Sequence, residues 1–168
     1  NNDYNVEDFL VPPEPLIQKQ FSRIMSLKDG SKKMSKSEVS DLSRINLKDS
    51  KDLIINKIKK AKTDPHPIPN IIEELENRPE AENLLGIYSS LKNQNINTTL
   101  KEFGGKNFSE FKTSLSEQLI DKISPMAKEI NKLLNDPGYL DKILLVGAEK
   151  ANDIAENKVR EMKKIIGF

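Results

Sequence analysis

The chain has 168 residues, with 27 lysines and arginines against 26 aspartates and glutamates, so its formal net charge is only +1. It contains no cysteine, which excludes disulfides, cysteine-ligated zinc, iron–sulfur clusters and thiol catalysis. No apolar run approaches the roughly 18 residues of a membrane span and no charged-then-apolar signal segment opens the sequence, so we expect a cytoplasmic protein without a membrane partner.

The positive charge is concentrated in one part of the chain. Residues 17–62 hold 13 basic and 5 acidic residues, whereas the segments on both sides of them are net acidic. Electrostatic attraction to a polyphosphate or to RNA should therefore be local to this part and should weaken as salt is added.

The first thirty residues have the pattern of the end of a larger domain. Residues 12–15 include three prolines, which exclude a central strand or a helix interior. Residues 21–27 alternate bulky apolar with polar residues, which predicts a strand around Arg23–Leu27 at the end of a sheet. Because this strand would have few partners, we expect its apolar face to be exposed.

Residues 30–40 combine a leading glycine with three lysines and four serines. Such a composition cannot bury a core, so we expect a mobile loop whose ammonium groups face water or a polyanion. Lysines and serine hydroxyls together suit a triphosphate, because they can follow charge as it moves toward a leaving pyrophosphate. The alternative interpretation is a solvated or phosphorylatable basic loop.

From residue 49 onward the pattern predicts helices. Asp49 or Ser50 can cap a helix that reaches Lys62. Its predicted buried stripe is Leu53, Ile54, Ile58 and Ala61, and its predicted solvent-facing lysines are Lys57, Lys59, Lys60 and Lys62. This basic face is either a solvated surface or a contact for RNA phosphate. His66 follows in a proline-rich connector, without a partner for catalysis, and we assign it no catalytic role.

Four further helices are predicted. They begin at Pro79, near Asn97, at Phe108 and after Asp136, and Pro125 should kink or divide the third of them. The aromatic and methionine positions of the third fall on one apolar stripe, so they are expected in the core and not on a base-stacking surface. The last helix should bury another stripe, made of Leu140, Ile143, Leu144, Ala151, Ile154, Ala155, Val159, Met162 and Ile165. The predicted fold class is therefore mainly α, a bundle of five or six helices.

One five-residue string is more specific than composition. Lys33-Met34-Ser35-Lys36-Ser37 matches the KMSKS signature of class I aminoacyl-tRNA synthetases letter for letter, and its surroundings resemble the bacterial-type tryptophanyl-tRNA synthetases. The likeness covers nearly the whole chain, through Pro13–Ile17, Arg23–Gly30, Ala61–Asp64, Asn83–Tyr88, Gly147–Ala151 and the terminal Gly167-Phe168. The family's HIGH-type signature and its tryptophan pocket have no counterpart here, so the chain resembles the C-terminal half of such an enzyme.

The resemblance implies a domain organisation. Residues 1–48 would be a short remnant of the α/β nucleotide-binding fold with the KMSKS loop. Residues 49–168 would be a helical region like the family's anticodon-binding region, with the last helix packing back on the catalytic domain. The intact enzyme would be a tryptophan–tRNA ligase that activates tryptophan with ATP and charges its tRNA, whereas this chain alone would be inactive.

The resemblance also implies roles for single residues. Lys33 and Lys36 would engage the ATP phosphates and carry catalysis, with Lys36 stabilising the charge that develops on pyrophosphate. Met34, Ser35 and Ser37 would shape the loop, and the backbone of Ile24 would touch the nucleotide, although its side chain can equally be a core residue.

The resemblance extends to ligands and partners. Mg²⁺ would accompany ATP, although no carboxylate here has the ligand spacing of a metal site. Tryptophan, ATP and tRNA(Trp) would be the partners of the intact enzyme, expected to be a homodimer.

Two alternatives stay open at this point. The chain could be a non-catalytic helical module that binds RNA or a partner through residues 17–62. It could also derive from the related tyrosyl-tRNA synthetases, although their usual separate C-terminal RNA-binding domain has no likeness in the helical residues 140–168.

Overall fold

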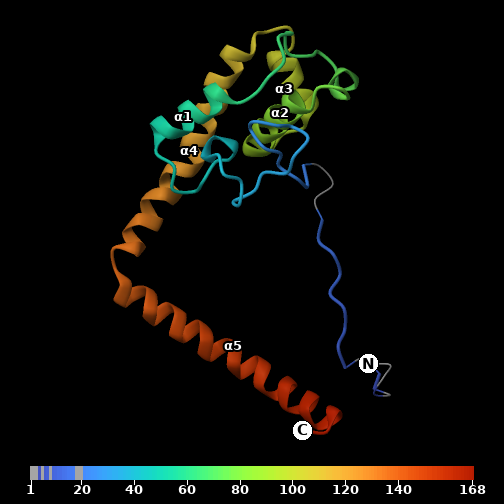
Figure 1. Ribbon diagram of the computed structural model, residues 1–168, viewed down its shortest axis with the longest axis vertical. Helices are drawn as coiled ribbons and strands as arrows, with labels where there is room; N and C mark the ends of the chain where they lie inside the picture. Colours follow the sequence, from blue (N-terminus) through green and yellow to red (C-terminus); the bar gives the residue numbers. More distant parts are fainter. Residues whose placement is uncertain (1–3, 5, 8, 18–20) are drawn as a thin grey trace. The chain divides into compact units, whose positions relative to one another are not determined.

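The computed structural model describes the chain except for residues 1–3, 5, 8 and 18–20 (Figure 1). It forms two compact units, one of residues 18–131 and one of residues 1–17 with 132–168. The mainly α class is confirmed. The described elements are η2 (Asp41–Ser43), α1 (Lys51–Lys60), η3 (Ile72–Leu75), α2 (Pro79–Lys92), α3 (Ile96–Phe103), α4 (Phe108–Leu134) and α5 (Pro137–Ile166).

The helices begin where the capping residues predict. The Ser50 hydroxyl accepts the N–H of Leu53 at the start of α1, and the Asp136 carboxylate accepts the N–H of Tyr139 at the start of α5. Pro79 occupies the first turn of α2, where its missing N–H leaves no helical hydrogen bond unmade. Local chemistry therefore sets these boundaries before any packing is considered.

The core of the unit formed by residues 18–131 lies among α1, α2, α3 and the first half of α4 (Figure 1). Its centre is aromatic: the Tyr88 and Phe103 rings lie 5.2 Å apart between centroids, and the Phe103 and Phe111 rings 5.1 Å apart, both in edge-to-face contact. All three side chains are buried. The prediction that the aromatic positions of the helix starting at Phe108 lie in the core is thus confirmed for Phe108 and Phe111.

The strand predicted around Arg23–Leu27 is reduced to one isolated antiparallel bridge, between Met25 and Lys33. The expectation of an exposed apolar face is wrong at Leu27, whose side chain is buried in the core. The backbone explains this burial. The N–H of Leu27 donates to the carbonyl of Ser43 and its carbonyl accepts from Lys62, so the segment is paired with loop and helix-end residues where a sheet was expected.

The long helix α4 runs through Pro125 without being divided. Its buried residues end at Ile123, and Met126, which we expected in the core, is 44% exposed. The apolar periodicity continues past Ile123, but periodicity identifies a face without supplying a partner for it.

The last helix, α5, contains no buried residue. The prediction that its apolar stripe is buried is therefore wrong for the chain as described. Within its own unit α5 contacts the N-terminal residues, since Lys158 Nζ lies 3.9 Å from the centroid of the Phe9 ring. None of the described helices combines the length and apolar character needed to cross a membrane.

Candidate functional site

The signature loop, residues 30–40, begins at a short stem in which the backbone of residues 24–26 pairs with that of residues 32–34. The N–H of Ser26 donates to the carbonyl of Lys32 at 2.8 Å, and the N–H of Met34 donates to the carbonyl of Ile24 at 3.0 Å. These bonds flank the bridge between Met25 and Lys33. Pairing of the two short segments therefore fixes the backbone of Lys33 and Met34 beside that of Ile24.

The stem is attached to α2. The Asn83 amide accepts the N–H of Met25 at 2.8 Å and donates to the carbonyl of Met25 at 2.9 Å, so it pairs with this residue as a neighbouring strand would. Gly30 lies against the start of α2, where an added Cβ would be 2.7 Å from the backbone nitrogen of Glu80. Only glycine fits this approach. The first turns of α2 thus hold the stem at two points.

A cleft of about 840 Å³ opens beside the stem. It brings together four of the six predicted nucleotide-binding residues, namely Ile24, Lys33, Met34 and Lys36. Ser35 and Ser37 are not among its lining residues. Their hydroxyl oxygens are 2.8 Å apart, and the N–H of Ser37 donates to the Ser35 hydroxyl, so the two serines contact each other within the loop.

Five cations and one carboxylate line the cleft. Besides Lys33 and Lys36, its lining includes Arg23, Arg44 and Lys48, which the sequence analysis did not single out, and Asp49 is its one carboxylate. The basic excess of residues 17–62 is the signal that points to them. The side chains of Lys33 and Lys36 are exposed, and neither ammonium makes a hydrogen bond or ion pair within the described part of the chain. A polyanion is the ligand that such a cleft favours.

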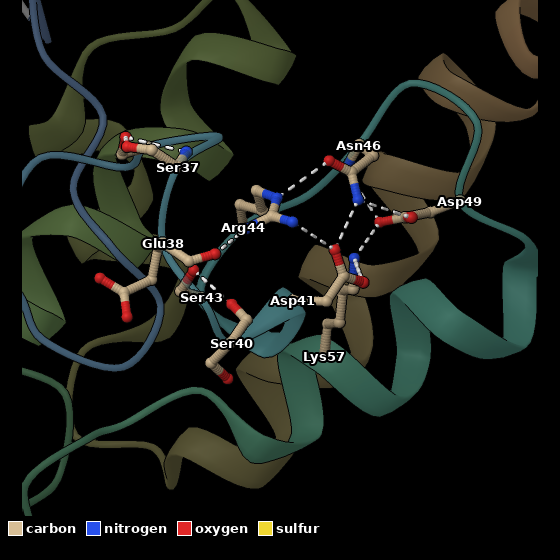
Figure 2. A network of polar contacts seen from close by, with 10 residues as sticks. Ser37, Glu38, Ser40, Asp41, Ser43, Arg44, Asn46, Asp49 and Lys57 are labelled. Carbon is tan, nitrogen blue, oxygen red and sulfur yellow. Dashed lines mark hydrogen bonds and ion pairs between the residues drawn. The ribbon is translucent and has the colours of Figure 1, made fainter.

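A cluster of polar side chains, Asp41, Arg44, Asn46, Asp49 and Lys57, joins the end of the signature loop to α1 (Figure 2). Lys57 Nζ lies 2.7 Å from Asp41 Oδ2 and 2.7 Å from Asp49 Oδ2, and the lysine side chain is 0% exposed. The prediction that Lys57 faces solvent is wrong, because two carboxylates compensate its buried charge. The sequence did contain a signal, since position 57 is three residues after Ile54 and adjacent to Ile58 on the buried stripe.

The contacts of this cluster lower the pKa of Asp41. A hydrogen bond from Lys57, followed by one from Asn46, holds the pKa of the Asp41 carboxyl below its usual value. Asp49 accepts from Lys57 and from the backbone N–H and side-chain amide of Asn46. Its oxygens are thus used within the protein, and the described residues contain no group of three or more His, Cys, Asp or Glu side chains that could hold a metal ion.

Comparison with known proteins agrees with the motif. A family model described as "tRNA synthetases class I (W and Y)" matches residues 2–124. The tryptophan–tRNA ligase of Agrobacterium fabrum is 51% identical over 166 residues, which are 99% of this chain and 47% of that protein. The enzyme of the same name from Caulobacter vibrioides is 48% identical over 168 residues, which are 100% of this chain and 49% of that protein.

Solved structures agree as well. The crystal structure of tryptophanyl-tRNA synthetase from Mycoplasma pneumoniae matches with a TM-score of 0.70 and 26% identity, covering 90% of this chain and 45% of that one. This chain spans about half the length of the curated relatives that it matches. The extent of the family match and the identity to these relatives together place the chain among the class I tRNA synthetases of the tryptophan and tyrosine (W and Y) family.

Proposed function

We propose that this chain supplies the signature-loop half of the ATP site of a tryptophan–tRNA ligase. The intact enzyme would join tryptophan to ATP as an adenylate with loss of pyrophosphate, and then pass the acyl group to the terminal ribose of tRNA(Trp). The single observation that carries the proposal is the cleft in which Lys33 and Lys36 of the KMSKS sequence lie with Ile24. The names of the curated relatives support tryptophan over tyrosine as the amino acid.

The proposed roles follow from charge and geometry. Lys33 and Lys36 would bind the ATP phosphates, and Lys36 would stabilise the charge that develops on pyrophosphate in the transition state. The Ile24 carbonyl accepts from Met34 and keeps a second lone pair, so the backbone contact of Ile24 to the nucleotide would be made by its carbonyl or its N–H. Met34 would shape the cleft wall, and the Ser35 and Ser37 hydroxyl contact would hold the turn that presents Lys36.

The remaining ligands and partners are part of the same proposal. Mg²⁺ bound through the phosphates would neutralise part of the charge of ATP. Residues 1–48 would belong to the nucleotide-binding domain and residues 49–168 to the anticodon-binding-like region. The enzyme would act in the cytoplasm as a homodimer.

A non-catalytic RNA-binding module is the competing proposal, and its support is the basic composition of residues 17–62. The two functions make opposite statements about Lys36. A catalytic lysine acts mainly in the transition state, whereas a phosphate-binding lysine of an RNA module contributes a uniform, salt-dependent share of affinity.

The deciding experiment replaces Lys36 by alanine in the full-length protein that contains this chain. We expect tryptophan-dependent ATP–pyrophosphate exchange to fall on the order of 10²–10³-fold in kcat, the range for loss of one preorganised charge-stabilising donor, with a smaller change in affinity for ATP and tRNA. Lys32→Ala is the matched control, because Lys32 is in the same loop but is paired with Asp29 and does not line the cleft. Normal exchange by Lys36→Ala, with weakened tRNA binding, would favour the RNA-binding module. Exchange that depends on tyrosine would assign the related enzyme.

A further inference from the structure

Arg44 clips the end of the signature loop to the segment that follows it. Its Nη1 donates to the backbone carbonyl of Glu38 at 2.8 Å, and Glu38 directly follows the last signature residue, Ser37. Its Nη2 lies 3.0 Å from Asp41 Oδ1, and its Nε donates to Asn46 Oδ1 at 3.3 Å. Each nitrogen of the guanidinium therefore contacts either the end of the loop or the segment directly after it (Figure 2).

Two of the residues that Arg44 contacts, Asp41 and Asn46, are connected in turn to Lys57 of α1. The side-chain amide of Asn46 donates to Asp41 at 3.0 Å and to Asp49 at 3.2 Å. Both carboxylates contact the buried ammonium of Lys57, which is rooted in the middle of α1. Satisfied polar networks of this kind are rigid, so the clip connects residue 38 to a helix of the core and not to another mobile loop.

The charges of this cluster balance. Arg44 and Lys57 are two cations matched by Asp41 and Asp49, so the cluster is formally neutral. Arg44 lines the cleft with Lys36, and its contacts to Glu38, Asp41 and Asn46 use three of its five N–H donors. Its contacts within the chain all go to residues 38–46, so they hold the end of the loop in place.

We infer that Arg44 is a positioning residue for adenylate formation, acting through the carbonyl of Glu38 to keep Lys36 at the cleft. This inference rests on the proposed function, because it assigns Arg44 a role in that same site. The expected effect is on rate, since Lys36 keeps its charge in an Arg44 variant but loses its fixed placement. Misplacement by about 1 Å can lower a rate on the order of 10²-fold.

The test uses Arg44→Met and Arg44→Lys in the full-length ligase. Lysine keeps the positive charge but has no planar fork that could reach Glu38, Asp41 and Asn46 together. We expect kcat for tryptophan-dependent ATP–pyrophosphate exchange to fall on the order of 10-fold or more in both variants, while KM for ATP changes by less than about threefold. Hydrogen exchange of a peptide covering residues 35–41 should be faster than in the parent protein.

A second variant keeps the test decisive if Arg44 substitutions impair folding. Asp41→Asn changes a half-exposed residue and weakens its ion pair with Arg44, while Arg44 itself is kept. This variant should also lower kcat at nearly constant KM for ATP. Lys106→Met is the control, because it removes an exposed cation and ion pair away from the cleft lining and should leave exchange unchanged.

Two patterns would overturn the inference while leaving the proposed function intact: wild-type kcat in both Arg44 variants, or a near-normal Arg44→Lys with a raised KM for ATP in Arg44→Met. The second pattern would mean that Arg44 binds phosphate as a charge. Absence of exchange in the parent protein would instead refute the proposed function and this inference with it.

Discussion

Replacing Lys57 by methionine tests the buried ion cluster most directly. The change removes a fully buried cation and keeps a similar apolar stem. The two carboxylates respond differently: the Asp41 side chain is 49% exposed and can return to water, whereas the Asp49 side chain is 4% exposed and keeps only the donors of Asn46. Only one buried charge is thus left uncompensated.

The cost follows from that asymmetry. Breaking a buried pair by removing one partner costs about 3–5 kcal/mol, and we expect the lower end, about 3 kcal/mol in the free energy of unfolding, since Asp41 can be solvated. Lys57→Met combined with Asp49→Asn removes both buried charges and keeps a side chain of similar shape. The double variant should therefore lose less than Lys57→Met alone, by about 1–2 kcal/mol.

The assay is urea unfolding of the 168-residue chain, followed by far-ultraviolet circular dichroism and extrapolated to water. Lys60→Met is the control on the same helix, at an exposed position, and should change the unfolding free energy by less than about 0.5 kcal/mol. The reasoning would be refuted if Lys57→Met cost no more than Lys60→Met, or if the double variant were the least stable of the three.

Two further predictions concern titration and mobility. Burial, assisted by the Glu102 carboxylate, raises the pKa of the Tyr88 phenol to about 12, so its contribution to stability should be complete below about pH 10 and lost as the pH rises to about 12. Absorbance at 295 nm should show a late step that Tyr88→Phe removes; without such a step the prediction fails. Without ATP, residues 30–40 should exchange amide hydrogens faster than helices α1 to α4, since their lysines repel one another, and protection equal to that of α2 would contradict this.

Sequence alone determined the helical class, the starts of the helices and the signature. Ser50, Pro79 and Asp136 act on the backbone within a few residues of themselves, so their effect can be derived without a fold. The KMSKS string is contiguous and was equally readable. The extent of the core could not be read from the sequence. The apolar stripes of α4 beyond Ile123 and of α5 predict an apolar face, but they do not show whether another element covers it.

Only the tertiary structure decided which polar residues organise the candidate site. Asn83 pairs with Met25 across 58 positions of sequence, and Lys57 is buried only because Asp41 and Asp49 converge on its ammonium. The side chain of Arg44 lies among acceptors that the loop places around it. Local patterns classify such residues as solvent-exposed because an isolated charge or amide is costly to bury, and that cost is offset only by partners that the folded chain brings together.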